Sequence, residues 1–314
     1  MATPIFYDTA FAANDFAAFV AQIKAQARAL GIGAPILDAA FDGVTLNQKV
    51  LAADQHQPEF TLTFAQYRSR VVSAQRLAIC RENIARNRNL LEAVDQRIPA
   101  DPRIVAGIWG IESGFGQKTG NYAIVEALTT LAYHGRRAAY FHHELMNALK
   151  ILEAGDIAPR AMTGSWAGAM GQPQFMPSSY LTYAVDFDGD GKRDIWHSLP
   201  DVFASVSNYM ARSGWVAGEP WGQPIQLPAH FNPAHAARTF ANAKTKPLGA
   251  WSALGVRRFD GTSFSRDDVP GIVLVPDGLG GDAFMIYRNF RAIRRYNPSD
   301  YYALGVGLLG FGSA

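Results

Sequence analysis

The chain has 314 residues, of which 48% are hydrophobic and 18% are charged, and its net charge at pH 7 is +2. This composition excludes a largely disordered chain, and the near-neutral charge gives no indication of a nucleic-acid binder. A chain of this length accommodates one large domain or two to three small ones.

The N-terminal residues 1–15 contain no basic region followed by a continuous apolar segment, so we expect no signal peptide in them. No apolar run reaches the length of a membrane span. Two interpretations therefore stay open: a cytoplasmic protein, or an exported one whose targeting segment is absent from this chain. The single cysteine, Cys80, cannot form a disulfide within the chain.

The first hundred residues are predicted to be helical. Apolar residues recur at helical spacing over residues 14–30, and Gly31 is a typical helix stop. A short helix is expected over residues 35–41, and residues 61–96 are rich in helix-forming residues. We therefore predict an N-terminal helical module over residues 1–93, against which a final helix over residues 303–314 packs.

Residues 101–116, DPRIVAGIWGIESGFG, begin with an Asp and a Pro that are typical of a helix start. An apolar face follows and ends at one carboxylate, Glu112, beside glycines. A carboxylate at the end of a mainly buried helix is a candidate proton donor with a raised pKa. The alternative at this point is that Glu112 caps a turn or pairs with an arginine.

Two further helices are expected, over residues 123–133 and 138–152. Between them lies a pair of cations, Arg136 and Arg137. Their interpretation stays open between an exposed helix start and a clamp for an anionic substrate group. The nearby His142-His143-Glu144 lacks the H-E-x-x-H spacing of zinc peptidases, so we reject a zinc site there.

Residues 164–180, GSWAGAMGQPQFMPSSY, are rich in glycine and proline but too apolar for a solvated loop. Such a loop suits the wall of a groove, where amide side chains bind neutral hydroxyl groups. Residues 186–194, DFDGDGKRD, match the first half of an EF-hand calcium loop, after which position twelve is His197 in place of Glu. The alternative is an Asp-Gly turn without metal.

From about residue 211 to 280 glycine, proline and tryptophan become frequent and short strand-like runs appear, such as residues 271–275. This indicates a small β-containing insert. Residues 281–302 are assigned to the same core as residues 94–210. The predicted fold class is mainly α with some β (α+β).

Four segments together resemble the lytic murein transglycosylases of the B type, a family with a lysozyme-like catalytic core. They are GIWGIESGFG (107–116), the long run 164–196, SVSNYM (205–210) and RNFRAIRRYNPSDYYALGVG (288–307). They occur in the family's order, and the run 164–196 is the most specific of them. The resemblance extends from about residue 87 to the C-terminus and implies a lysozyme-like core.

The resemblance implies that Glu112 is the sole catalytic acid and base. It assigns substrate binding to groove residues and to the arginine pair: Ser165, Gln174, Tyr209, Tyr296, Asn297, Arg136 and Arg137. It also implies a structural calcium ion, with no cofactor required for the chemistry, held by Asp186, Asp188, Asp190, Lys192 and Asp201. In this chain Asp188 replaces a less acidic family residue, and the loop before Asp201 is one residue longer.

The implied activity is non-hydrolytic cleavage of the β-1,4 bond between N-acetylmuramic acid and N-acetylglucosamine in peptidoglycan, leaving 1,6-anhydromuramoyl ends. One carboxylate is sufficient for this reaction when the substrate supplies its own nucleophile, whereas ordinary glycosidases use two. The alternatives are a hydrolytic muramidase and a non-catalytic wall-binding protein. The resemblance also implies a monomer in the periplasm whose partners are glycan strands and cell-wall synthesis proteins.

Overall fold

The computed structural model describes residues 9–55 and 62–312. The residues expected to lack a signal peptide therefore lie mostly outside the described part. Contacts group the chain into two compact units, a first unit of residues 1–59 and 116–202 and a second unit of residues 60–115 and 203–314. The predicted helical module of residues 1–93 is thus divided between the two units. In the described ranges, none of the helices has both the length and the apolar character needed to cross a membrane.

The first unit is built mainly of helices. Those over residues 9–29, 34–40, 124–134 and 138–154 follow the predicted runs, although the first begins earlier than predicted, whereas the helices over residues 48–55, 177–183 and 199–212 were not predicted. Its elements are α1 (Thr9–Ala29), α2 (Ala34–Ala40), α3 (Gln48–Gln55), β1 (Tyr122–Ala123), α8 (Ile124–His134), α9 (Ala138–Ala154), a 3-10 turn (Pro159–Ala161), β2 (Thr163–Gly164), α10 (Pro177–Tyr183) and the start of α11 (Leu199–Arg212).

Helices α8 and α9 form the centre of the first unit, and both have long buried faces. The N-terminal helices attach to them through carboxylates. Glu126 of α8 accepts hydrogen bonds from the Thr45 hydroxyl and the Asn47 side chain, and Glu153 of α9 accepts from the Gly33 amide. These bonds satisfy backbone and side-chain donors at the entries to α2 and α3, where a helix leaves its first amides unpaired.

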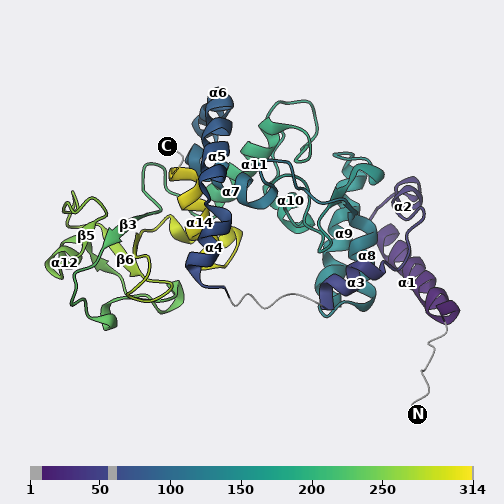
Figure 1. The fold of residues 1–314 in the computed structure, drawn as a ribbon. Helices are drawn as coiled ribbons and strands as arrows, with labels where there is room; N and C mark the ends of the chain where they lie inside the picture. Colours follow the sequence, from purple (N-terminus) through teal and green to yellow (C-terminus); the bar gives the residue numbers. More distant parts are fainter. Residues whose placement is uncertain (1–8, 56–61, 313–314) are drawn as a thin grey trace, which may run out of the picture. The chain divides into compact units, whose positions relative to one another are not determined.

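The second unit combines helices with one small sheet (Figure 1). Its helices are α4 (Phe64–Val71), α5 (Ala74–Arg86), α6 (Arg88–Arg97), α7 (Pro102–Ser113), the end of α11, α12 (Leu248–Ala253), α13 (Phe290–Tyr296) and α14 (Asp300–Phe311). The predicted helical region of residues 61–96 is therefore three helices. The first break lies before α5, where the Ser73 side chain caps the helix by accepting from the Arg76 amide. The second lies at Asn87, where α5 ends.

Helix α14 packs against α7, and in Figure 1 it lies beside α4, α5 and α7. Glycines make the approach possible. A Cβ added at Gly107 of α7 would lie 2.5 Å from the carbonyl oxygen of Val306, and one at Gly310 of α14 would lie 2.1 Å from that of Arg103. Both distances are shorter than a van der Waals contact, so only glycine fits. This close packing brings the start of α14 beside the end of α7.

The sheet has the strand order β4-β6-β7-β3-β5, and every neighbouring pair is antiparallel. The strands are β3 (Gly222–Gln226), β4 (Lys246–Pro247), β5 (Arg257–Arg258), β6 (Pro270–Leu274) and β7 (Phe284–Ile286). The central strand β7 lies beyond residue 280, the predicted end of the insert. The sheet is therefore longer in sequence than the predicted β-containing segment.

The sheet region has a hydrophobic core of its own, which includes Trp251, Val273 and Met285. It is tied to the helices of the same unit at the start of α4. The Asp277 carboxylate accepts from the amides of Phe64 and Ala65, at 2.7 and 2.8 Å, and so pairs two donors that the helix start leaves free.

Candidate functional site

Glu112 lies in the last turn of α7, as the sequence predicts. Asp101 caps the start of the helix by accepting from the Arg103 amide. The helix ends sharply because the next residues, Gly114 and Phe115, both have positive φ, at 58° and 61°. Glycine adopts this left-handed conformation without strain, which explains the glycine-rich sequence that follows Glu112. The turn leaves the Glu112 carboxyl at a helix end, where it can face a ligand.

The Glu112 carboxyl is a weak acid in this protein. Burial raises its pKa from the usual value near 4.5 to about 7, and a hydrogen bond from Tyr302 acts in the opposite direction. Although the side chain as a whole is half-buried, its carboxyl is sufficiently removed from water to favour the neutral form. In residues 9–55 and 62–312, no second carboxylate is among the causes of the shift. Among these residues no ion pair joins Glu112 to an arginine, so the alternative of such a pair is not supported there.

Tyrosines surround Glu112. The Tyr302 hydroxyl, on the first turn of α14, donates to Glu112 Oε1 at 2.6 Å. The Glu112 charge contributes to raising the pKa of Tyr67, to about 12, and of Tyr296 and Tyr302, in each case after burial as the larger cause. All three phenols are therefore neutral at ordinary pH and able to donate hydrogen bonds beside the carboxyl.

Tyr209 of α11 and Tyr296 of α13 complete this cluster. Their ring centroids are 4.6 Å apart, and the Tyr296 ring is stacked on that of Tyr302 at 6.4 Å with an interplanar angle of 9°. The Tyr209 hydroxyl donates to the carbonyl of Arg295 at 2.6 Å, which fixes the corner at the end of α13. Two residues predicted from the sequence, Tyr209 and Tyr296, thus lie with Glu112 in one cluster.

Asn297, the third predicted residue of this unit, ends α13. Its side-chain oxygen accepts from the Ser299 amide at 3.1 Å, and Ser299 in turn caps α14. Asn297 lines a cavity of about 660 Å³ together with Tyr67 and Tyr302. Tyr302 therefore lines this cavity and also binds Glu112 through its hydroxyl. A cavity of this size accommodates a sugar-sized ligand.

Ser165 and Gln174 belong to the first unit and stabilise the predicted groove-wall loop. The Ser165 hydroxyl accepts from the Ala169 amide, and the Gln174 side-chain amide donates to the carbonyls of Thr119 and Gly171 at 2.9 and 2.8 Å. Gln174 has a φ of 54°, which is unusual for a residue other than glycine. Strained backbone of this kind is found preferentially at functional sites.

The two predicted arginines have different surroundings. Arg136 donates to the carbonyl of Asp54 at 2.6 Å, and its amide donates to the Asp54 carboxylate. Arg137 lies over the rings of Tyr140 and Phe141, about 5 Å from each centroid. Both side chains are exposed, and Arg136 is held to the carboxyl end of α3.

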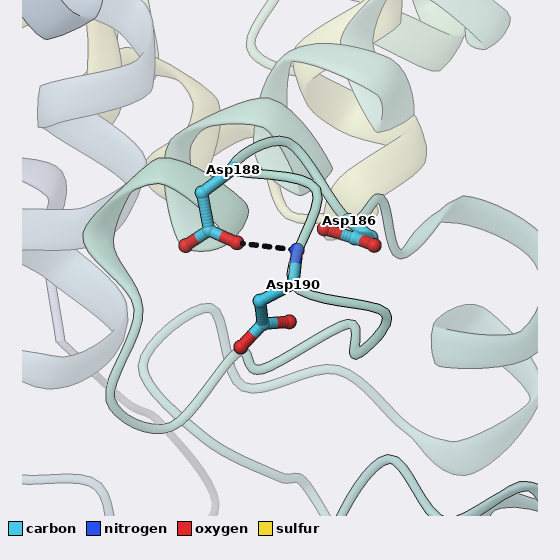
Figure 2. Close-up of side chains that lie close together, drawn as sticks. All are labelled: Asp186, Asp188 and Asp190. Atoms are coloured by element: carbon cyan, nitrogen blue, oxygen red, sulfur yellow. Dashed lines mark hydrogen bonds between the residues drawn. The ribbon is translucent and has the colours of Figure 1, made fainter.

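The Asp186 loop brings three carboxylates together (Figure 2). Oxygens of Asp186, Asp188 and Asp190 all lie within 4.8 Å of one another. The loop is held in shape by its own amides: Asp186 accepts from Gly189 and Gly191, at 2.7 and 2.9 Å. Three carboxylate oxygens this close to one another are suited to a hard cation such as Ca²⁺.

Asp201 is buried and joins the two ends of this loop, as it accepts from the amides of Phe187 and Asp194 at 2.8 Å each. Burial raises its pKa, and the charges of Asp188 and Asp186 add to the increase. It is not part of the cluster of three. Lys192, also predicted as a ligand, donates its amide to Asp190 and has an exposed side chain.

Two members of the tyrosine cluster were not predicted as site residues, namely Tyr67 and Tyr302. The signal for Tyr302 was weak, because it shares the first turn of a mainly apolar helix with a second phenol, Tyr301. Tyr67 had none, since its position beside Glu112 depends on the packing of α4 against α14. Sequence spacing alone does not report such packing.

The comparisons with known proteins agree with this geometry. Residues 15–311 match the family described as the transglycosylase SLT domain. The chain is 37% identical over 218 residues to the membrane-bound lytic murein transglycosylase B of Escherichia coli, a match that covers 67% of this chain and 56% of that protein. The matched region thus spans little more than half the length of this curated relative.

Solved structures show the same fold. SltB3 from Pseudomonas aeruginosa, in a complex with NAG-anhNAM-pentapeptide, superimposes with a TM-score of 0.88 and 44% identity, covering 94% of this chain and 78% of that one. The Escherichia coli lytic transglycosylase Slt35, in a complex with calcium, has a TM-score of 0.76 and 28% identity, covering 96% and 93%. The predicted fold class, a mainly helical lysozyme-like protein with a small sheet, is confirmed.

Proposed function

Because the chain belongs to the transglycosylase SLT domain family, we propose that it is a lytic transglycosylase that cleaves the glycan strand of peptidoglycan. The observation that carries this proposal is a single carboxyl, Glu112, with a pKa of about 7, surrounded by neutral tyrosines. A relative, SltB3, has been crystallised with NAG-NAM-pentapeptide. We infer the same substrate class for this chain.

The first step needs a proton donor. Near neutral pH about half of the Glu112 carboxyls are protonated, which is suited to general acid catalysis. Glu112 gives its proton to the oxygen between N-acetylmuramic acid and N-acetylglucosamine, and the bond from the anomeric carbon to that oxygen breaks. The acetamido oxygen of the muramic acid holds the anomeric carbon in place of an enzyme carboxylate.

The second step needs a base, and the ionised Glu112 now fulfils that role. It takes the proton of the C6 hydroxyl as this oxygen forms a bond with the anomeric carbon and displaces the acetamido oxygen from it. This closes the 1,6-anhydro ring, regenerates the free acetamido group and restores the acid. The Tyr302 hydroxyl, 2.6 Å from Oε1, stabilises the ionised form between the two steps. No water is consumed. Ser165, Gln174, Tyr209, Tyr296 and Asn297 are proposed to position the sugars.

Product analysis tests the proposed reaction. Purified sacculi digested with the protein are expected to release muropeptides with anhydro ends, which are lighter by one water than the products of hydrolysis. Mass spectrometry separates the two. Products with reducing ends would instead identify a hydrolytic muramidase. Binding to sacculi without any release of muropeptides would indicate a non-catalytic wall-binding protein.

The pH dependence of kcat/KM is expected to follow the pKa of Glu112. The protonated form is the active acid, so kcat/KM should fall above about pH 7. Because the Tyr302 hydrogen bond lowers this pKa, Tyr302→Phe should move the fall to higher pH and reduce the maximal rate about tenfold. Rates measured from pH 5 to 9 on soluble glycan strands give both values. An unshifted profile in the variant would remove Tyr302 from this role.

We also infer that Asp186, Asp188 and Asp190 hold a calcium ion that stabilises the loop without taking part in the reaction. Millimolar Ca²⁺ should then raise the melting temperature of the wild type measured in EGTA-treated buffer. Asp190→Asn should abolish the increase, while Asp15→Asn, a change at an exposed site, should keep it. An equal increase in both variants would contradict the site.

The proposed substrate also bears on where the protein is located in the cell. Since peptidoglycan lies outside the cytoplasmic membrane, we infer a periplasmic location. On the family resemblance alone we also propose a monomeric protein and contacts with cell-wall synthesis proteins. Fractionation of cells and light scattering of the purified protein test the first two inferences.

A further inference from the structure

A second cavity, of about 600 Å³, lies in the sheet region of the second unit and shares no residue with the cavity beside Tyr302. Its walls come from the loop before β3, from β5, from the segment before β6 and from the residues that follow β7. None of its lining residues has a part in the reaction proposed above. Its chemistry is therefore a separate question.

Charged side chains line this cavity. The Arg266 guanidinium donates two hydrogen bonds to the Asp268 carboxylate, so this ion pair adds no net charge to the cavity. Arg288 is exposed, and no hydrogen bond or ion pair of its side chain occurs with another described residue. Arg258 approaches a carboxylate, that of Asp260, only at 4.0 Å. Two guanidinium groups are thus available to a ligand, and guanidinium groups match carboxylates in shape and charge.

The polar floor of the cavity adds a further donor. Tyr287 is buried, and its hydroxyl accepts from the Gln223 side-chain amide. The phenol proton is therefore free to be donated, and burial keeps it on the oxygen by raising the pKa of Tyr287. The Arg258 charge acts on the same phenol in the opposite direction, in keeping with its place in the same wall.

The cavity also has an anionic and an apolar part. Glu219 lines it and, over the described residues, its carboxylate forms no ion pair, while the buried ring of Phe264 provides an apolar wall. A neutral sugar would leave two guanidinium groups and a carboxylate without partners. A ligand that carries carboxylates and an ammonium group satisfies both signs of charge.

We propose that this cavity binds the peptide stem of peptidoglycan, through Arg258 and Arg288 to its carboxylates and Glu219 to its amino group. The inference rests on the proposed function, because that function brings stem peptides to the protein along with the glycan. Stem peptides combine free carboxylates with an amine, and a chain of a few residues matches a cavity of about 600 Å³. The geometry favours them over any uncharged part of the same substrate.

Calorimetric titration of the free stem pentapeptide into the full chain tests the proposal without any turnover. We expect the Arg258→Gln, Arg288→Gln double variant to bind the pentapeptide at least about tenfold more weakly than the wild type. Lys244→Gln, which removes an exposed cation of the same region outside the cavity, should bind as the wild type does. The proposal would be overturned if the double variant bound the pentapeptide as tightly as the wild type does. It would also be overturned if the wild type bound inorganic phosphate as tightly as the pentapeptide.

A kinetic comparison separates this inference from the proposed function. On peptide-bearing strands the double variant should show a KM raised about tenfold at unchanged kcat, and on strands stripped of peptides by an amidase it should equal the wild type. A uniform loss on both substrates would contradict peptide binding. Absence of turnover by the wild type on either substrate would instead contradict the proposed function, while leaving the titration valid.

Discussion

Glu112→Gln is expected to lower kcat/KM for the release of anhydro muropeptides by at least about 1,000-fold, because one residue serves as acid and then as base. Glutamine has nearly the same shape, and its side-chain oxygen can still accept the hydrogen bond from Tyr302, which is 2.6 Å long in the wild type. The loss should therefore be one of chemistry and not of binding. Release of muropeptides, quantified by mass spectrometry, measures it.

Two observations keep this result interpretable. Glu92→Gln changes an exposed carboxylate of the same unit and should retain full activity.

The folded state of Glu112→Gln can be checked by thermal melting at two pH values. Because burial raises the pKa of Glu112 to about 7, its ionisation opposes folding as the pH rises from about 4.5 to 7. The variant lacks this cost and should be the more stable protein at pH 8, with little difference at pH 4. Retained turnover would remove Glu112 from its central role.

The position of Glu112 could be predicted because local rules determine it. The Asp-Pro start, the apolar helical face and the glycine stop of α7 all act within a few residues of the chain. The carboxylate cluster of the Asp186 loop was predictable for the same reason, since its three aspartates lie within one short loop. Asp201 is different. It acts as a backbone acceptor at both loop ends, which spacing could not reveal.

The surroundings of Glu112 depend on packing over long separations in sequence. Tyr302 is 190 residues away from Glu112, and it reaches the carboxyl only because α14 packs on α7. The strand β7 was likewise assigned to the returning core, although it pairs with β3 and β6 at the centre of the sheet. A run of three residues carries too little sequence pattern to identify its partners.

The glycines at the contact of α7 and α14 allow the close packing that places Tyr302 beside Glu112. In a helix interior, replacing glycine by alanine ordinarily stabilises a protein by about 1 kcal/mol. At Gly310 the sign should reverse, because the added Cβ would lie 2.1 Å from the carbonyl oxygen of Arg103. A backbone atom cannot rotate away as a side chain can, so the two helices must separate.

We therefore expect Gly310→Ala to lower the free energy of unfolding by about 2–4 kcal/mol and to reduce activity together with stability. Separation of the helices lengthens the hydrogen bond from Tyr302 to Glu112, so the fall of kcat/KM with pH should also move upward, as in Tyr302→Phe. Gly280→Ala is the matched control, because a Cβ there meets nothing within 4 Å. Denaturant unfolding measures the stability of both. A Gly310→Ala protein as stable as the wild type would show that α7 and α14 do not depend on this contact, and the Tyr302–Glu112 geometry would then need another cause.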